Sequence, residues 1–234
     1  MSATRTAGAR WALVGLASEI VFTLGWLVAA AWQGPGYSPI HHDISEMGAL
    51  TAPYPWAFLL PQALAGAASI AFVLFGLRPA LRGAGRAGWT GPWLVALSGL
   101  QDLTDAVFRL DCRAADGCDQ AQTAASWHGQ VHNAIGFCCV LIMAISPFVL
   151  ARRFRRLPEW RRLALPSLVT GGLFIAGLVL VVAPATAVDQ GLTQRAMAAL
   201  GAAWGSWVAI HLYRLTRQTS VGGASRAATV PANL

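Results

Sequence analysis

The side chains best suited to chemistry lie in two histidine-bearing segments, and the first is Trp127–Asn133. His128 and His132 are four residues apart there. On a helix, residues at this spacing share a face, so both imidazoles could bind one zinc ion. The glutamate of the zinc-protease motif H-E-x-x-H is absent, because Gly129 stands in its place. The pair is therefore either a metal-binding pair or an interfacial His128 beside a His132 that hydrogen bonds inside the protein.

The second segment, His41–Glu46, combines two imidazoles, two carboxylates and a hydroxyl group. His41 or His42 could supply a third metal ligand, and the hydroxyl group of Ser45 is a candidate catalytic group. The alternative is a solvated loop in which Asp43 or Ser45 caps a short interfacial helix. The residue types alone leave both interpretations open.

Acidic side chains within apolar stretches form a third group of candidates. Asp102 and Asp105 lie near the end of one stretch, and Glu19 lies in the middle of another. Ionisable groups in a membrane helix are costly and usually face the protein interior or a water-filled cavity. Asp102 or Asp105 could pair with Arg109, or could orient or deprotonate a metal-bound water. Glu19 either bonds a polar neighbour or takes part in a proton relay.

A pair of cysteines and a pair of glycines each predict a structural contact. Cys112 and Cys118 flank a short acidic segment, and we expect them to form a disulfide on the oxidising side of a membrane. Gly201 and Gly205 form a G-x-x-x-G pattern, which allows close helix contact. That contact could lie within the protein or between two copies of the chain.

The elements that must position these residues are membrane-spanning helices. Of the 234 residues, 56% are hydrophobic and 12% are charged, whereas about a quarter of the residues of a soluble domain are charged. This composition excludes a disordered chain, a disulfide-rich miniprotein and an ordinary soluble domain. The net charge of +7 comes with no lysine. In so apolar a chain we assign this charge to membrane orientation, and we expect no nucleic-acid partner.

Six apolar stretches approach the roughly 20 residues that cross a bilayer. We therefore expect an all-α, six-span transmembrane bundle that forms a single domain over residues 1–215, followed by a flexible cytoplasmic tail over 216–234. The first stretch is long for a signal peptide and contains Glu19, so we expect it to be retained. The predicted spans are 11–31, 56–77, 89–108, 128–150, 163–183 and 196–213.

The arginines predict the orientation of these spans. Fourteen of the 17 arginines fall in the segments that connect the spans on one side or flank the bundle on that side. Short basic segments stay in the cytoplasm, so both termini are expected there. Four of the five histidines and most of the acids then lie towards the outer side. Together with the bias towards alanine and arginine, this predicts a multi-pass protein of a bacterial inner membrane.

The segments His42–Pro53 (HDISEMGALTAP) and Phe108–Asn133 (FRLDC…WHGQVHN) resemble a known family. It is the prokaryotic integral membrane family called domain of unknown function nine-nine-eight. The best marker is Ile44–Ala49, I-S-x-x-G-A, followed by an imidazole near the start of the fourth span. The resemblance covers about residues 11–215, and it implies a six-helix integral membrane protein without an established activity.

A looser similarity links the chain to the alkaline ceramidase and adiponectin-receptor group of membrane hydrolases. In that group an H-x-x-x-H pair, a further histidine, a serine and an aspartate surround a zinc ion. That group has seven spans with the pair near the last, whereas this chain has six predicted spans with the pair in the fourth. The matching pair is His128 and His132, and the other candidates are Ser45, His41 or His42, and Asp102 or Asp105.

Three functions follow from these patterns. The first is a zinc-dependent hydrolase that acts on a small amphiphilic substrate at the outer leaflet, with a metal-bound water as the nucleophile. The second is a small proton-coupled transporter that uses Glu19, Asp105 and His132 as a relay. The third is a non-enzymatic membrane protein whose polar outer end binds a partner. All three require a lipid bilayer, and none requires a homo-oligomer.

Overall fold

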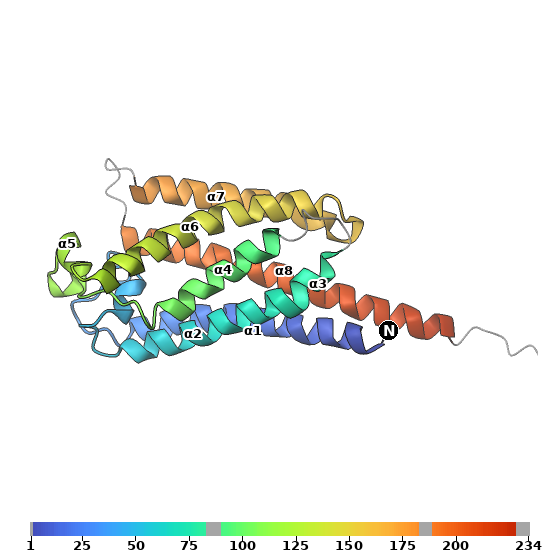
Figure 1. Cartoon of the computed structure of the whole chain (residues 1–234), viewed down its shortest axis with the longest axis horizontal. Coiled ribbons are helices and arrows are strands. Elements are labelled where there is room, and N and C mark those ends of the chain that lie inside the picture. The colour runs from blue at the N-terminus through green and yellow to red at the C-terminus, as the bar shows by residue number, and fades with distance from the viewer. Residues whose placement is uncertain (1, 83–89, 183–188, 228–234) are drawn as a thin grey trace, which may run out of the picture.

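The structure is a computed structural model, and it describes residues 2–82, 90–182 and 189–227. These residues form helices and contain no β-strand, which confirms the all-α prediction. The long helices run along one bundle (Figure 1) and are α1 (Ser2–Ala30), α2 (Pro55–Phe72), α4 (Thr90–Thr104), α6 (Trp127–Phe154), α7 (Ala164–Val182) and α8 (Gln190–Ala227). Shorter elements are η1 (Ser45–Gly48), η2 (Val73–Leu77), α3 (Arg78–Ala80), η5 (Ala114–Asp116), α5 (Gln120–Thr123) and η6 (Pro158–Leu163).

Each of the apolar stretches that the sequence predicts as a span overlaps one long helix. The predicted span ends Trp89 and Ala183 lie outside the described residues. The largest difference is in α8, which continues to Ala227 and so extends through much of the predicted tail 216–234. After α8 begins, no proline occurs before Pro231, so no proline stops this helix at residue 213.

Four helical segments within the described ranges are long and apolar enough to cross a membrane. The helix of α4 has only 15 residues, and α8 is interrupted by charged and polar residues. The four segments indicate a membrane protein, whereas the six-span topology and the location of the termini stay predictions. The segments are Ala7–Ala30, Pro55–Ala80, Trp127–Phe154 and Pro158–Val181.

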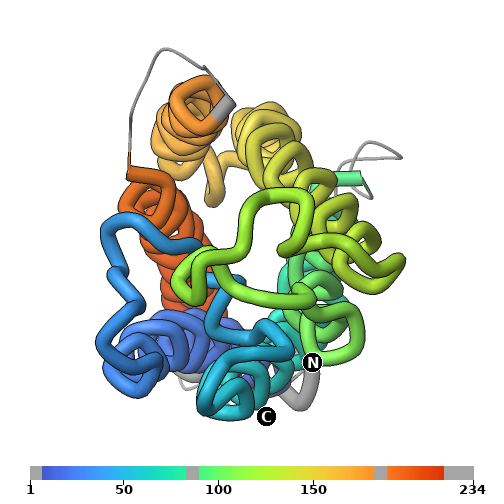
Figure 2. Tube along the Cα trace, turned by 90° about the vertical axis from the view of Figure 1, so that its left-hand side faces the viewer, coloured from blue at the N-terminus to red at the C-terminus, as the bar shows by residue number. Residues whose placement is uncertain are grey.

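The long helices form a closed ring when the bundle is viewed from its end (Figure 2). In order around the ring, α1 packs against α2, α2 against α4, α4 against α6, α6 against α7, α7 against α8, and α8 against α1. Residues 31–54 and 105–126 cross the end of the ring that faces the viewer. We name these two loops, with residues 189–195 at the start of α8, the loop cap.

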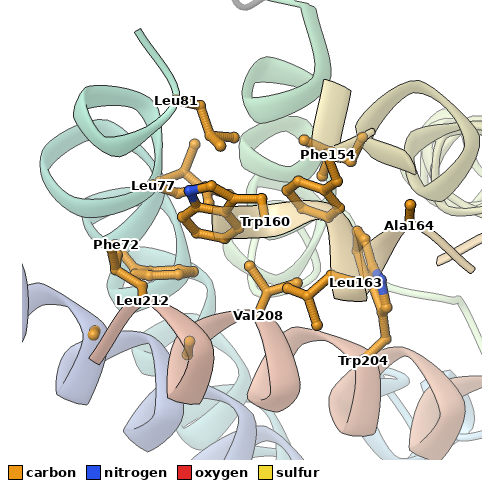
Figure 3. Close-up of a cluster of buried hydrophobic side chains, with 14 of the residues drawn as sticks. Phe72, Leu77, Leu81, Phe154, Trp160, Leu163, Ala164, Trp204, Val208 and Leu212 are labelled. Carbon is orange, nitrogen blue, oxygen red and sulfur yellow. The ribbon is translucent and has the colours of Figure 1, made fainter. Parts of the chain in front are cut away.

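An aromatic cluster fills the bundle at the end opposite the loop cap (Figure 3). Trp160 is stacked on Phe154 with their ring centroids 5.2 Å apart, and it meets the His211 ring edge-on at 4.9 Å. We name this group the Trp160 cluster. It closes this end of the ring with buried side chains from several helices, including Ala12, Phe72, Leu77, Leu150, Trp204, Val208 and Leu212.

A second apolar cluster lies beneath the loop cap, and we name it the Trp26 cluster. It joins side chains of α1 and α2 to the first loop and to η1. Met47 at its centre is fully buried. The cluster therefore closes the other end of the ring, and its members are Trp26, Ala29, Tyr37, Ile44, Met47, Phe58 and Leu59.

Candidate functional site: an acidic cavity inside the bundle

A cavity of about 220 Å³ lies inside the ring, and all the long helices contribute to its wall. Along α1, the wall residue Glu19 lies between Ala12 of the Trp160 cluster and Trp26 of the Trp26 cluster. Apolar side chains of the two clusters therefore flank the cavity towards both ends of the bundle. In the part of the chain that the structure describes, no arginine or histidine belongs to the wall. Its polar residues are Ser18, Glu19, Ser45, Gln62, Ser69, Ser98, Gln101, Asp102, Asp105, Cys139 and Gln194.

Glu19 reaches the cavity from α1 because a glycine faces it on α8. A Cβ atom on Gly205 would lie 2.8 Å from Cδ of Glu19, closer than side chains tolerate. The other glycine of the G-x-x-x-G pattern, Gly201, faces the side chains of Met143 and Phe174. Both glycines lie in the cavity wall. The pattern therefore makes room inside the bundle for the Glu19 carboxyl group.

Asp102 is positioned by the close approach of α2 and α4. A Cβ atom on Gly99 would lie 3.0 Å from the carbonyl oxygen of Gly66, and one on Gly66 would lie 2.8 Å from Cβ of Asp102. Only glycine at these positions lets the two backbones come so near. The Asp102 carboxyl group therefore sits deep in the bundle, on the same cavity as Glu19.

Asp105 lies one residue beyond α4 and is buried against His132 of α6. Nδ1 of His132 is 2.9 Å from the carbonyl oxygen of Phe108 and 3.4 Å from Oδ1 of Asp105. A carbonyl oxygen only accepts hydrogen bonds, so Nδ1 of His132 carries the proton. Ser126 caps the start of α6 by accepting a hydrogen bond from the amide of Gly129, and this fixes the helix that carries His132.

Of the two interpretations that the sequence leaves open for Asp102 and Asp105, the structure does not support pairing with Arg109. Arg109 instead donates hydrogen bonds of 2.7 Å to the carbonyl oxygens of Gly48 and Ala49. The reason is that α4 ends at Thr104, so the helical spacing between the aspartates and the arginine is lost. Consequently the carboxyl groups of the cavity receive no arginine from within the described residues.

Gln62 is a polar wall residue with an unused acceptor. Its Nε2 atom donates to the carbonyl oxygen of Phe22 at 3.4 Å, which orients the amide. The side chain is almost fully buried, and its Oε1 atom has no hydrogen-bond partner among the residues described. A buried acceptor without a donor is costly, so this oxygen favours a hydrogen-bond donor from a ligand or a water beside it.

The cavity meets the loop cap at η1. Ser45 and Ile44 both belong to the cavity wall, and the amide of Ile44 donates a hydrogen bond to Oε1 of Gln194 on α8. The amide of Leu192 likewise donates to the carbonyl oxygen of Ile40, at 2.8 Å. The first loop is therefore attached to α8 directly above the cavity.

Three arginines hold the loop cap together. Arg109, as above, donates to the first loop, and so does Arg195, whose Nη1 atom lies 2.6 Å from the carbonyl oxygen of Pro39 and 2.8 Å from that of His42. The other terminal nitrogen of Arg195 donates to the hydroxyl group of Tyr37. Nη1 of Arg113 donates to the carbonyl oxygen of Gln33 at 3.0 Å. All three guanidinium groups thus bind backbone carbonyls of the same loop.

The predicted disulfide between Cys112 and Cys118 is present in the structure. It closes the segment that contains Arg113 and Asp116, which form an ion pair with each other. The same segment is joined to the first loop, because the amide of Ala115 donates to Oε2 of Glu46 at 3.1 Å. The disulfide therefore stabilises the loop that carries two of the cap's polar connections.

Hydrogen bonds lower the pKa values of two acids of the loop cap, and burial raises the pKa of a third. Hydrogen bonds from Arg113 and Thr51 hold the pKa of Asp116 below its ordinary value. Hydrogen bonds from Ser126 lower the pKa of Asp111 in the same way. Burial, and then the neighbouring Glu46, raise the pKa of Asp43. The first two carboxyl groups therefore support the cap in their charged form.

The histidines proposed as zinc ligands are engaged separately. Nδ1 of His41 lies 2.6 Å from Asp189, and Nδ1 of His42 accepts a hydrogen bond from the amide of Ser38. His128 lies against the rings of Trp127 and Phe108. Among the described residues, no group of three or more histidine, cysteine, aspartate or glutamate side chains is arranged to hold a metal ion. Zinc binding stays a prediction. The four histidines proposed as its ligands, which include His132, do not come together in one site.

The cavity brings together four of the candidates that the sequence provides: Glu19, Ser45, Asp102 and Asp105. His132 contacts Asp105 but is not part of the wall. Sequence reasoning missed Gln62, although an amide within an apolar stretch is the same kind of pattern that selected Glu19. It also missed Gln194, which lies outside the predicted span 196–213.

The apolar helices and the polar cavity between them are typical of an all-helical membrane protein. The chain belongs to the family described as Protein of unknown function (DUF998), whose family model matches residues 5–211. This confirms the resemblance that the sequence motifs carry. No curated protein and no solved structure matches the chain.

Proposed function

We propose that the protein is a small proton-coupled carrier of the bacterial inner membrane. The observation that carries the proposal is the convergence of Glu19, Asp102 and Asp105 on one cavity between two apolar clusters. A charged carboxyl group away from water is costly unless a proton or another cation accompanies it. Protons and a substrate that compete for these carboxyl groups would be coupled in their transport.

The proposal includes six spans with the loop cap outside and both termini in the cytoplasm. Two of the long helices, α4 and α8, are not among the candidate spans by length and composition. Each of them lies between candidate spans in the ring. Both also expose large apolar side chains, including Trp93 and Leu97 on α4 and Leu192 and Trp207 on α8. Since lipid surrounds their neighbours in the ring, these two helices cross the same bilayer in the proposed topology.

The apolar clusters at both ends of the cavity favour a carrier over an open channel. The Trp26 cluster and the loop cap close the outer end, and the Trp160 cluster closes the inner end. In the proposed cycle each barrier opens in turn, so that the carboxyl groups exchange protons with one side at a time. The carboxyl groups involved are those of Glu19, Asp102 and Asp105, and the neighbouring side chains Cys139, in the wall, and His132, beside Asp105, are not assigned a proton.

The proton part of the proposal is tested without knowledge of the substrate. Purified protein in liposomes is adsorbed on a solid-supported membrane, and the outer solution is switched from mildly alkaline to mildly acidic. We expect a transient inward current that is larger than in protein-free liposomes and is strongly reduced in Glu19→Gln and Asp102→Asn. The matched control Glu159→Gln removes an exposed acid outside the cavity and leaves the current intact. A wild-type current equal to that of protein-free liposomes overturns the proposal.

The zinc-dependent hydrolase is the weaker candidate. Its proposed acid, base and hydroxyl groups, Asp102, Asp105 and Ser45, do lie on one cavity. Its metal ligands do not join them, because His41, His42 and His128 contact other residues outside the cavity wall. Zinc analysis of the purified protein and of a His128→Ala/His132→Ala variant tests this candidate directly.

A further inference from the structure

We infer that the central cavity binds a small protonated amine with an apolar body, whose ammonium group faces Glu19, Asp102 and the amide oxygen of Gln62. This inference deepens the proposed function, on which it rests for the role of the cavity in transport. Three properties of the cavity lead to it: the sign of its charge, its unused hydrogen-bond acceptor, and its apolar walls.

The charge of the wall selects a cation. Three carboxyl groups line the cavity, and within the described ranges no arginine or histidine lines it. The chain contains no lysine at all. Arg109, the nearest arginine in sequence to Asp105, is bound to the carbonyls of Gly48 and Ala49. A ligand with a positive charge would therefore supply the missing partner, whereas an anion would be repelled.

The acceptor selects a cation that carries N–H groups. Oε1 of Gln62 is buried and has no donor within the described part of the chain. The amide cannot reverse to solve this, because Nε2 is already directed at the carbonyl oxygen of Phe22. An ammonium group has three donors, enough to serve this oxygen and two carboxyl groups at once. A quaternary ammonium ion has the charge but no donor.

The remaining wall residues favour a ligand that carries a small apolar group. Aromatic and thioether side chains line the cavity beside the acids, including Phe22, Phe58, Phe174, Met143 and Met197. Aromatic faces attract cations, and methionine adapts to the shape of its ligand. The volume of about 220 Å³ is below the roughly 300–1,000 Å³ of sites for drug-sized molecules. A single ring with a short aminoalkyl group is of the appropriate class.

The inference is tested by calorimetric titration of the protein in lipid nanodiscs at neutral pH, with empty nanodiscs as the reference. The probes share a benzyl or phenyl group and differ in charge and donors: benzylamine, benzyltrimethylammonium, benzyl alcohol and benzoate. We expect benzylamine to bind best and benzyltrimethylammonium to bind at least about tenfold more weakly, because it has no N–H group to donate to Gln62 or to the two carboxyl groups. Benzyl alcohol and benzoate should show no saturable binding.

Variants connect this preference to individual residues. Glu19→Gln and Asp102→Asn should each weaken benzylamine binding by about tenfold or more, since each removes a buried charge partner. Gln62→Leu should reduce the preference for benzylamine over benzyltrimethylammonium by about threefold to tenfold, the effect of one lost hydrogen bond, while the second probe still binds. Glu159→Gln, which removes one exposed acid, should bind all four probes like the wild type.

Two outcomes overturn the inference: benzyl alcohol binding as tightly as benzylamine, or an unchanged preference in Gln62→Leu. The comparison of probes on the wild type holds even if a variant fails to fold. Proton currents without benzylamine binding would overturn the amine site and leave the carrier proposal standing. Benzylamine binding without proton currents would overturn the carrier proposal and leave the amine site standing.

Discussion

The three arginines of the loop cap all donate hydrogen bonds to carbonyl oxygens of the first loop. In the central cavity, by contrast, the carboxyl groups of Glu19 and Asp102 face no cationic side chain within the described ranges. Both regions place charge where water is scarce. In the cap the three guanidinium groups have partners inside the protein, whereas the carboxyl groups of the cavity have no cationic partner in its wall as far as the structure describes the chain.

This difference separates polar groups that support the fold from those available to a ligand. A satisfied buried charge stabilises the structure, and its loss leaves other groups unpaired. A buried charge without a partner destabilises the fold, and it is retained where it has a function such as binding. Substitutions in the cap should therefore change stability, whereas substitutions in the cavity should change binding and leave stability nearly unaffected.

The largest effect is expected for Arg195→Ala. The substitution removes hydrogen bonds to the carbonyls of Pro39 and His42 and to the hydroxyl group of Tyr37. We expect a loss of about 3 kcal/mol of unfolding free energy, or roughly 6–12 °C in Tm. Thermal unfolding in detergent measures this. Arg82→Ala, at an exposed arginine, is the control, and equal Tm values for the two variants would contradict the role of Arg195.

The second effect is the loss of the disulfide. Cys112→Ser combined with Cys118→Ser frees the segment that carries Arg113 and Ala115. We expect about 2 kcal/mol of destabilisation from the greater freedom of the unfolded chain. A reducing agent should lower the Tm of the wild type to that of the double variant and leave the double variant unchanged. A wild type insensitive to full reduction would show that this part of the cap does not support the fold.

A smaller, pH-dependent effect is expected at Asp116. Its pKa in the folded protein lies below the unfolded value of 3.8, so its contribution is fully present above that value. The contribution is lost as the pH falls through the folded pKa. At neutral pH, Asp116→Asn should therefore have a lower Tm than the wild type, and the difference should shrink in acid. A difference that grows in acid would mean that another group is responsible.

The smallest effect on stability is expected for Glu19→Gln. The substitution keeps the shape of a side chain whose charge has no partner in the described residues. We expect the Tm to stay within about 2 °C of the wild type or to rise. The same variant should weaken benzylamine binding by about tenfold or more, so the two measurements on one protein separate the cavity from the cap. A large fall in Tm would place Glu19 with the structural arginines instead.

The sequence identified the acids of the site but not the cavity that joins them. Glu19 and Asp102 are visible because charge within an apolar stretch is rare. Their convergence depends on Gly205 facing α1 and on Gly66 facing α4, and such long-range contacts are not encoded in local spacing. The position of Arg109, which the sequence left open, has the same origin. Its distance from Asp105 suggests a helical pair, but the helix ends first and the chain turns towards the first loop.

The metal prediction illustrates the same limit. The spacing of His128 and His132 holds on α6, as the helix requires. A third ligand from a loop depends on how that loop lies, and hydrogen bonds to Ser38 and Asp189 hold His42 and His41 elsewhere. Local periodicity thus predicted the helix, and loop contacts decided which histidines could meet.

The packing of α1 against α8 has a consequence for biosynthesis. The ring of described helices closes between α1 and α8, so Gly205 is made 186 residues after Glu19 and only then can face it. In the proposed topology the Glu19 carboxyl group therefore enters the membrane before its cavity exists. A carboxyl group in lipid is costly, so a proton should accompany it until α8 is in place. The order of synthesis thus makes α8 the helix that completes the cavity.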